Sequence, residues 1–412
     1  MAESKSQNKR SLLQSLTSRK RAPQSDTLNN TAMILIQNAE IYSPAYVGKQ
    51  DVLLCGGQIL SIADKIKAPA LPCHVIDATG KYLVPGLIDQ HVHVTGGGGE
   101  GSFHTRTPEL QLSELIQGGI TTVVGLLGTD GTTRTIENLY AKTMALNEEG
   151  VTAYMMTGAY DYDSPTITGK PDRDIVFIEK ILGVKLALSD HRSSNITTQE
   201  LIALASKARV AGMLSGKPGV VILHMGDGKR GLQPVFEALK TSDIPVGIFR
   251  PTHVGRNRKL REETFDLLKI GGYADFTCGS KKAGGPSRHI LEAIKRELPT
   301  EHITVSSDGH GSWSNYDEAG NLLEIGVAGV DSMMRELRHM VQEKELPLET
   351  ALPFFTTNVA NALGLGKHKG SIRENADADL LLLNKDLELD TVIAKGAIMM
   401  ESGNLLRKGT YE

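Results

Sequence analysis

Two histidines separated by a single residue, His91 and His93, are the side chains of this sequence best suited to chemistry. They end the apolar stretch "LIDQHVH", which predicts a β-strand. Side chains two positions apart in a strand point to the same face, so both imidazoles can reach one ion, whereas on a helix they would diverge by about 200°. The pair therefore predicts half of a metal site, although two structural histidines would give the same pattern.

Four further groups lie in or at the end of similar apolar segments. His224 follows "GVVIL", His253 ends "VGIFRPTH", and Asp308 follows "ITVSS". Lys185 lies within "GVKLAL", and a lysine in a buried strand needs a partner because an unpaired charge there is costly. Each residue alone has an ordinary structural explanation. Together they predict one metal centre at the ends of several strands.

Eight apolar strand candidates carry these groups, and amphipathic helical segments separate them. The strand candidates are "LIDQHVH", "ITTVVGLL", "TAYMMTGA", "GVKLAL", "GVVILHMG", "VGIFRPTH", "ADFTCG" and "ITVSSDG". Eight such units predict an α/β fold of the (β/α)8 (TIM) barrel type, whose sites lie at the carboxyl ends of the strands. A doubly wound open sheet is the main alternative, but the tetraglycine at 96–99 does not have GxGxxG spacing.

The two ends of the chain show short apolar stretches broken by Gly, Pro, Asn and Asp. We predict a small β-sandwich-like domain built from residues 31–85 and 372–412, around a barrel that spans residues 86–371. Two separate local hairpins are the alternative. Residues 1–30 are basic and rich in Ser, Gln and Asn, which predicts a disordered tail, with a mitochondrial-type presequence as the alternative.

Composition excludes several classes of partner. The formal net charge of −3 over 412 residues gives no reason to expect nucleic-acid binding. No apolar run approaches the roughly 20 residues that cross a bilayer, so we expect no membrane partner. Three scattered cysteines, Cys55, Cys73 and Cys278, argue against a disulfide framework and for a reducing compartment, and we expect a cytoplasmic protein.

The strand-end residues resemble the metal centre of the binuclear branch of the amidohydrolase superfamily. That resemblance implies two divalent ions, most naturally Zn²⁺, bridged by a CO2-derived carbamate on Lys185 (N6-carboxylysine). It implies that one ion is held by His91, His93, Lys185 and Asp308, and the other by Lys185, His224 and His253. Two zinc ions would leave residual positive charge, which lowers the pKa of bound water and polarises a carbonyl.

The loops after the strands indicate which family within this superfamily the sequence resembles. "HVHVTGGGGEG", "GLLGTD", "TGAY", "SDHRS", "HMGDGK", "PTHVGRN" and "SSDGHGS" are similar to the isoaspartyl (β-aspartyl) dipeptidase family, from about residue 33 to the C-terminus. The family pattern implies that Thr129 and Ser312 supply neutral donors to the substrate and that Gly98 contributes through its backbone. Thr129 and Ser312 each have a turn or cap role as the alternative.

The chemistry of a β-aspartyl dipeptide gives an independent check. Such a substrate carries a free α-amino group, a free α-carboxylate and the carboxylate of the leaving residue. Glu100 suits the ammonium, and Arg192 and Arg256 suit carboxylates because a guanidinium forms paired hydrogen bonds. The sequence does not say which arginine binds which carboxylate, and all three residues have surface roles as their alternative.

The resemblance also implies a mechanism, hydrolysis by a metal-bridging hydroxide. Tyr160 would polarise the scissile carbonyl as an oxyanion donor. Asp308 would act as general base toward the hydroxide and then as general acid toward the leaving amine. Members of the family form homo-oligomers, up to octamers, so we expect a homo-oligomer with a small dipeptide as its substrate.

Two other functions fit parts of the pattern. One is an amidohydrolase of the dihydroorotase or hydantoinase type, acting on cyclic amides that lack the free amine that Glu100 would bind. The other is a non-catalytic, dihydropyrimidinase-like assembly protein. Such proteins typically lose metal ligands, whereas all six expected ligands are present here.

Overall fold

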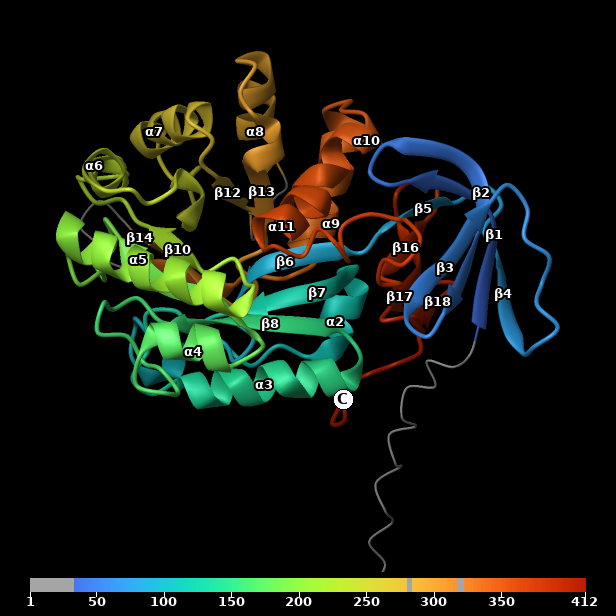
Figure 1. Cartoon of the computed structure of the whole chain (residues 1–412), viewed down its shortest axis with the longest axis horizontal. Helices are drawn as coiled ribbons and strands as arrows, with labels where there is room; N and C mark the ends of the chain where they lie inside the picture. Colours follow the sequence, from blue (N-terminus) through green and yellow to red (C-terminus); the bar gives the residue numbers. More distant parts are fainter. Residues whose placement is uncertain (1–32, 280–283, 317–321) are drawn as a thin grey trace, which may run out of the picture.

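The computed structural model describes residues 33–279, 284–316 and 322–412. The chain forms two parts (Figure 1). One is a barrel that helices surround, and the other is a β-sheet made from both chain ends. The predicted basic tail, residues 1–30, lies outside the described residues. Within the described ranges, no helix has both the length and the apolar character needed to cross a membrane.

Eight parallel strands form the barrel in the order of the sequence. They are β6 (Leu87–Val92), β7 (Ile120–Gly125), β8 (Thr152–Gly158), β9 (Ile181–Leu188), β10 (Val220–Met225), β11 (Phe249–Thr252), β12 (Ala274–Thr277) and β13 (Ile303–Ser306). An isolated bridge between Val92 and Gly309 joins the first strand to the segment after the last. The barrel is therefore nearly closed, which confirms the predicted fold.

The barrel strands are apolar along most of their length because both faces are covered. Every residue of β6, β7, β9 and β10 is buried. A strand of this kind appears in the sequence as a short continuous apolar run, without the alternation of a half-exposed strand. This pattern explains why the short apolar runs located the strands.

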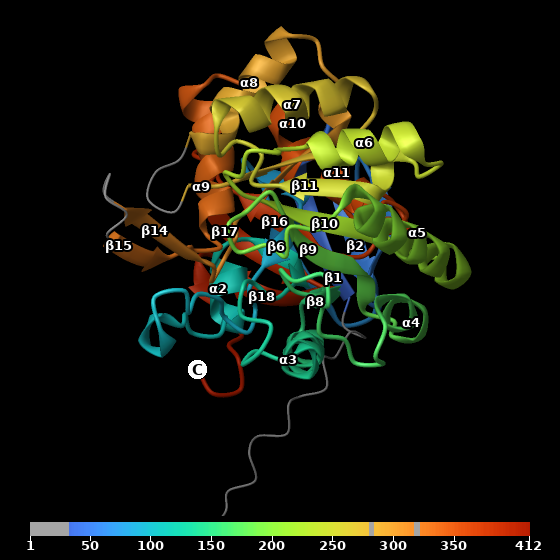
Figure 2. The same cartoon turned by 90° about the vertical axis from the view of Figure 1, so that its left-hand side faces the viewer.

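Helices cover the outside of the barrel (Figures 1 and 2). Those between the strands are α2 (Leu112–Gln117), α3 (Ile136–Glu149), α4 (Pro171–Phe177), α5 (Thr198–Ser215), α6 (Gln233–Thr241), α7 (Arg258–Lys269) and α8 (Gly285–Lys295). Their ends follow local chemistry. In α5, for example, Thr197 and Glu200 form a capping box at the start, and Gly216 ends the helix with φ +68°.

Shorter elements complete the barrel part. The segment after β13 forms the hairpin β14 (Ser312–Tyr316) and β15 (Leu322–Val327), followed by α9 (Ser332–Arg338), the π-helical turn η4 (His339–Glu343), α10 (Leu348–Ala351), the 3-10 turn η5 (Leu352–Phe355) and α11 (Thr357–Ala362). Three other 3-10 turns are η1 (Phe103–Thr105), η2 (Val246–Ile248) and η3 (Thr300–His302).

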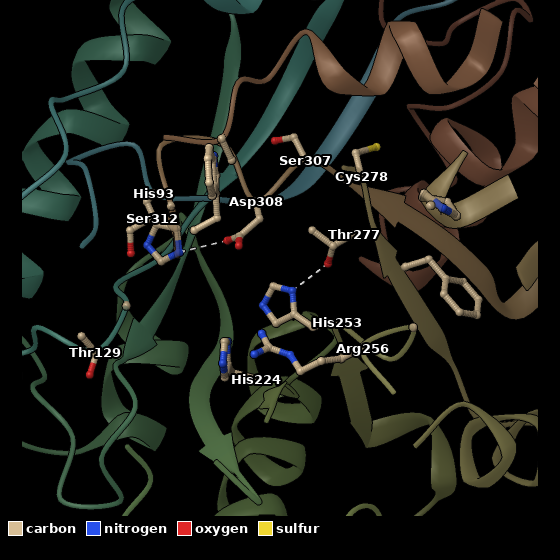
Figure 3. Close-up of a pocket in the computed structure, with 18 of the residues that line it drawn as sticks. His93, Thr129, His224, His253, Arg256, Thr277, Cys278, Ser307, Asp308 and Ser312 are labelled. Atoms are coloured by element: carbon tan, nitrogen blue, oxygen red, sulfur yellow. Dashed lines mark hydrogen bonds and ion pairs between the residues drawn. The ribbon is translucent and has the colours of Figure 1, made fainter. Parts of the chain in front are cut away.

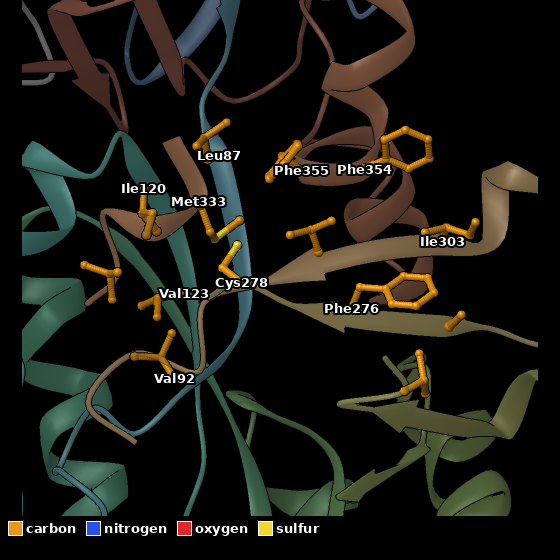
Figure 4. Close-up of a cluster of buried hydrophobic side chains, with 14 of the residues drawn as sticks. Leu87, Val92, Ile120, Val123, Phe276, Cys278, Ile303, Met333, Phe354 and Phe355 are labelled. Carbon is orange, nitrogen blue, oxygen red and sulfur yellow. The ribbon is translucent and has the colours of Figure 1, made fainter. Parts of the chain in front are cut away.

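The C-terminal helices and turns pack against the barrel through a large buried cluster (Figure 4). Leu87 of β6 and Ile303 of β13 belong to it, together with Phe354 and Phe355 of η5. Each is almost completely buried, and burying a side chain of this size stabilises the fold by roughly 1.5–3 kcal/mol. This packing supports β6, which carries His91, and β13, which precedes Asp308.

The second part is a nine-stranded sheet. Its strands are β1 (Met33–Tyr42), β2 (Tyr46–Cys55), β3 (Gln58–Ala63), β4 (Cys73–Asp77), β5 (Tyr82–Pro85), β16 (Leu380–Leu383), β17 (Leu389–Ala394), β18 (Ala397–Glu401) and β19 (Asn404–Leu405). The two chain ends meet where β5 pairs antiparallel with β16 and sets Val84 opposite Leu381. A buried cluster that includes Ile36, Leu83 and Leu382 forms the core of this β domain. The prediction of one β domain from both chain ends is therefore confirmed.

Candidate active site

A cavity of about 440 Å³ opens at the carboxyl ends of the barrel strands (Figure 3). Most residues singled out in the sequence line it: His93, Gly98, Glu100, Thr129, Tyr160, Arg192, His224, His253, Arg256, Asp308 and Ser312. His91 and Lys185 are not in this lining and are buried, with 1% and 0% exposure. The structure thus gathers the predicted site residues around one cavity.

These residues form two groups. We call the deeper group the floor; it consists of His91, His93, Lys185, His224, His253 and Asp308. We call the group carried by the loops the rim; it consists of Gly98, Glu100, Thr129, Arg192, Arg256 and Ser312. Tyr160 lies between them, because its hydroxyl is 2.7 Å from His224 Nδ1 and its ring faces the Arg192 guanidinium at 5.2 Å.

Asp308 connects the two histidines of the His-x-His pair. Its Oδ1 lies 3.2 Å from His93 Nε2 and 3.5 Å from His91 Nε2. Burial alone would raise the pKa of Asp308, but the opposing effects of His253, His93 and Lys185 lower it to about 2. The carboxylate is therefore ionised throughout the neutral range and can accept a proton or bind a cation.

Lys185 lies at the bottom of the floor. Its Nζ donates a hydrogen bond to His91 Nε2 at 3.0 Å. Burial lowers the pKa of Lys185 to about 7, and the nearby carboxylates of Asp308 and Asp275 oppose this effect only in part. Much of the amine is therefore uncharged at neutral pH and available as a nucleophile.

His253, which lines the cavity, has a ring nitrogen without a partner. Its Nδ1 is 2.7 Å from the Thr277 hydroxyl, while its Nε2 has no hydrogen-bond partner within the described part of the chain. Burial holds the pKa of His253 well below its usual range, so the ring is neutral, and Nε2 keeps a lone pair when Nδ1 carries the proton and donates it to Thr277. Ligand atoms of His91, His253 and Asp308 all lie within 4.8 Å of one another, which is close enough for a compact metal centre.

His224 is more strongly engaged by the protein. Its ring centroid lies 4.5 Å from that of His253, but Asp190 Oδ2 and Arg192 Nη2 both lie 3.2 Å from its Nε2. Burial keeps the pKa of this imidazole far below its ordinary value as well. His224 therefore lies on the floor as predicted, with contacts that also tie it to the rim.

Two floor residues have backbone conformations that non-glycine residues seldom adopt. His253 has φ +61° and Asp308 has φ +55°. Left-handed backbone at such residues costs free energy and persists where the surrounding structure enforces it, often at functional sites. At Asp308 the neighbouring Gly309 is fixed by its carbonyl, which accepts from the His93 N–H at 2.8 Å.

Two of the three rim charges, Glu100 and Arg192, are paired with each other. Arg192 Nη1 lies 2.9 Å from Glu100 Oε1, and the Ser312 hydroxyl donates to Glu100 Oε2 at 3.1 Å. Asp190, only 1% exposed, accepts two further bonds from Arg192 at 2.9 Å. The sequence predicted that Glu100 binds the substrate ammonium and that Arg192 binds one of its carboxylates, and the structure places these opposite charges side by side.

Glycine is required in the loop that carries Glu100. Gly98 has φ +71°, and a Cβ there would lie 2.5 Å from the Thr105 carbonyl oxygen. Arg134, which the sequence did not single out, donates to the Gly97 and Thr107 carbonyls at 3.1 and 2.9 Å. The tetraglycine is therefore a tightly folded loop that Arg134 holds in place.

Comparisons with known proteins agree with this geometry. A model of the amidohydrolase family matches residues 252–399. A dihydroorotase of Streptococcus pyogenes serotype M3 is 34% identical over 392 residues, which cover 85% of this chain and 90% of that protein. The chain belongs to the amidohydrolase family.

Two solved structures extend the comparison for this amidohydrolase. A β-aspartyl dipeptidase of Fervidobacterium islandicum AW-1, in complex with β-Asp-Leu, is 41% identical with a TM-score of 0.85 and is matched over 90% of this chain and 98% of that chain. A dihydropyrimidinase of Brevibacillus agri is 17% identical with a TM-score of 0.58, over 92% and 97% of the two chains, which shows a shared fold.

The floor of this amidohydrolase is chemically suited to divalent metal ions. It offers neutral imidazoles, an ionised carboxylate and the unpartnered Nε2 of His253. His/carboxylate sets of this kind bind zinc and several other divalent ions. The donor set therefore fits the metal dependence that is general in the family.

Sequence reasoning missed two buried acids beneath the floor of the amidohydrolase. Asp89 Oδ1 accepts from the N–H groups of His91 and Ser307 at 3.3 and 3.2 Å, and the Ser307 hydroxyl donates to Asp89 Oδ2. Asp275 accepts from Thr252 Oγ1 at 2.7 Å, one residue before His253. An acid inside an otherwise apolar strand was the available signal in both cases.

The sequence also contained no indication of one wall of the cavity, which lies between β12 and the start of α8. Phe276, Cys278, Arg288 and His289 line it. His289 was not among the predicted site residues because it does not lie at a position expected for a metal ligand. Only the folded chain shows that α8 begins at the cavity.

Proposed function

We propose that this amidohydrolase is a metal-dependent β-aspartyl dipeptidase. The observation that carries the proposal is the pairing of Glu100 with Arg192 on the rim, 2.9 Å apart, above a floor able to hold metal ions. The 41% identity with the Fervidobacterium dipeptidase over nearly the whole of that protein supports it.

The rim pair suits the aspartyl end of such a substrate. A free α-amino acid group is a zwitterion, with an ammonium and a carboxylate on the same carbon. Glu100 would bind the ammonium and Arg192 the carboxylate, so the substrate would replace one ion pair by two. Arg256, whose Nη1 is 3.9 Å from Asp227, would bind the carboxylate of the leaving residue.

The floor residues would hold two divalent ions, as the sequence predicted. His91, His93, Lys185 and Asp308 would hold one, and Lys185, His224 and His253 the other. When bound, the ions would supply a polarised carbonyl and an acidified water. Lys185 is proposed to be a carbamate, formed when its amine nitrogen bonds to the carbon of CO2 and releases a proton, because an ammonium would repel the ions.

The protein's own groups would then move one proton. Asp308 would accept a proton from the attacking water and later donate it to the nitrogen of the leaving residue. Burial raises the pKa of Tyr160 far above its usual range, so its hydroxyl stays protonated and can donate to the developing oxyanion. A cytoplasmic location and a homo-oligomeric assembly stay predictions.

A second function has a specific observation in its favour. The 34% identity with the Streptococcus dihydroorotase points to cyclic amide substrates. Such substrates have no free α-amino group, so Glu100 would have no cation to bind. The proposal of a β-aspartyl dipeptidase accounts for Glu100, and this is why we prefer it.

The deciding experiment compares the two substrate classes on one preparation. Zinc-loaded protein is assayed with β-Asp-Leu, dihydroorotate and hydantoin, and kcat/KM is measured for each. We expect β-Asp-Leu to exceed the cyclic amides by at least 100-fold, an estimate from the lost charge-assisted bonds. Faster turnover of a cyclic amide would replace the proposal by the second function, and no turnover of any substrate would favour a non-catalytic role.

A further inference from the structure

The cavity wall at the start of α8 is not used by the proposed mechanism. It comprises Phe276 and Cys278 from β12 and its end, and Pro286, Arg288 and His289 from α8. When a dipeptide is bound between the rim and the floor, the side chain of its leaving residue still needs a place in the cavity. The charged residue on this wall, Arg288, is therefore a candidate for selecting that side chain.

Arg288 differs from the two arginines of the rim in its pairing. Arg192 is bound by Asp190 and Glu100, and Arg256 lies 3.9 Å from Asp227. Arg288 is exposed and, within the part of the chain that the structure describes, has no acidic side chain within ion-pairing distance. Its guanidinium can therefore bind an anion without first breaking an ion pair.

The position of Arg288 is set by its neighbour. Its Nε donates to His289 Nε2 at 3.1 Å. The His289 ring is only 4% exposed and stacks on Phe276, with centroids 5.3 Å apart and an angle of 22°. The remaining guanidinium nitrogens are left for a ligand.

The same histidine places Arg288 near the loop of Arg256. A Cβ on Gly255 would lie 2.8 Å from His289 Cδ2, so the backbone next to Arg256 rests directly on this ring. The two guanidinium groups thus belong to one side of the cavity. A ligand whose backbone carboxylate is bound by Arg256 would have its side chain within reach of this wall.

We propose that Arg288 forms a subsite for a second carboxylate, so that the enzyme prefers β-aspartyl dipeptides with an acidic leaving residue. The inference rests on the proposed function. The three charged groups common to all β-aspartyl dipeptides are assigned to Glu100, Arg192 and Arg256, which leaves Arg288 for a charge on the leaving side chain. Glutamate and aspartate in that position supply it.

The test compares β-Asp-Glu with β-Asp-Gln, which has almost the same shape and lacks the charge. For the natural enzyme we expect kcat/KM to be about 5–20-fold higher for β-Asp-Glu, mainly through a lower KM, because a single partly exposed pair contributes modestly. Added salt should reduce the ratio. Arg288→Gln should bring the ratio close to one, and Arg288→Glu should reverse it.

Lys295→Gln is the matched control, because Lys295 is a basic, exposed residue at the other end of α8. This variant should keep the preference for β-Asp-Glu. Equal kcat/KM for the two dipeptides in the natural enzyme, or an unchanged ratio in Arg288→Gln, would overturn the subsite alone. Failure to cleave any β-aspartyl dipeptide would overturn the proposed function and the subsite with it.

Discussion

The floor and the rim of the cavity are built in different ways. The floor side chains come from strand ends, and burial shifts the pKa values of Lys185, His224 and His253 toward their neutral forms. The rim residues come from loops, and two of them, Glu100 and Arg192, form an ion pair. A buried floor of neutral imidazoles and one carboxylate suits ligation of cations, whereas an ion pair on the rim suits recognition of a zwitterion.

This contrast suggests a division of labour. The geometry of the floor depends on the barrel, because His91 and His93 share a strand face and Asp308 follows the last strand. The geometry of the rim depends on where loops such as the tetraglycine run. Substitutions in the floor should therefore abolish turnover of every substrate, and substitutions in the rim should change which substrate is preferred.

The largest effect is expected for Asp308→Asn. The amide keeps the size of the side chain but cannot accept the proton, so we expect kcat for β-Asp-Leu to fall about 10²–10⁴-fold. Steady-state assays on zinc-loaded protein measure this, with circular dichroism as the control for folding. Turnover within a few-fold of the natural enzyme would remove Asp308 from the mechanism.

Lys185→Ala should come next. Removing the amine removes the ligand that we propose both ions share, so the variant should retain fewer than two zinc ions per chain and lose most of its activity. Metal analysis after gel filtration gives the stoichiometry. In a crystal of the natural, metal-loaded enzyme at neutral pH, a bare amine at Lys185 would contradict the proposed carbamate.

Glu100→Gln should separate the rim from the floor. The change removes the charged partner of the substrate ammonium. We therefore expect kcat/KM for β-Asp-Leu to fall by about 10–100-fold. N-acetyl-β-Asp-Leu has no ammonium, so its slower hydrolysis should change little. Equal losses on the two substrates would show that Glu100 acts through the structure of the site instead.

The sequence allowed the fold and the floor to be predicted because both follow from regular geometry. Short apolar runs marked the barrel strands, and side chains at their ends converge in any barrel of this kind. The partners of the rim could not be predicted, because the contact between Glu100 and Arg192 depends on two loop paths. Asp89 was overlooked for a related reason, since one of its two hydrogen-bond partners, Ser307, follows a strand more than 200 positions away.

The smallest effect is a pH dependence at the wall beside the rim. Burial, with Arg288 and Arg261, lowers the pKa of His289 from 6.5 to about 4, and Glu292 opposes them. Between these values the unfolded chain binds a proton that the folded chain does not, so the free energy of unfolding should fall as pH drops from 6.5 toward 4. The slope from one such group is at most about 1.4 kcal/mol per pH unit.

His289→Phe tests this effect, because phenylalanine can stack on Phe276 and does not titrate. Urea unfolding of the metal-free protein between pH 4 and 8 should show a flatter dependence on pH in the variant. His368→Phe is the control, because His368 is exposed. Identical slopes in the natural protein and His289→Phe would show that His289 is not held neutral by the fold.

The most direct test of the whole account compares β-Asp-Leu with α-Asp-Leu on the zinc-loaded enzyme. The two dipeptides contain the same residues and differ in which aspartyl carboxyl forms the peptide bond, so only the β isomer presents its ammonium and α-carboxylate together to Glu100 and Arg192. We expect kcat/KM for β-Asp-Leu to be roughly 100-fold or more above that for α-Asp-Leu, because the α isomer loses the same charge-assisted bonds. Comparable rates on the two isomers would contradict the account.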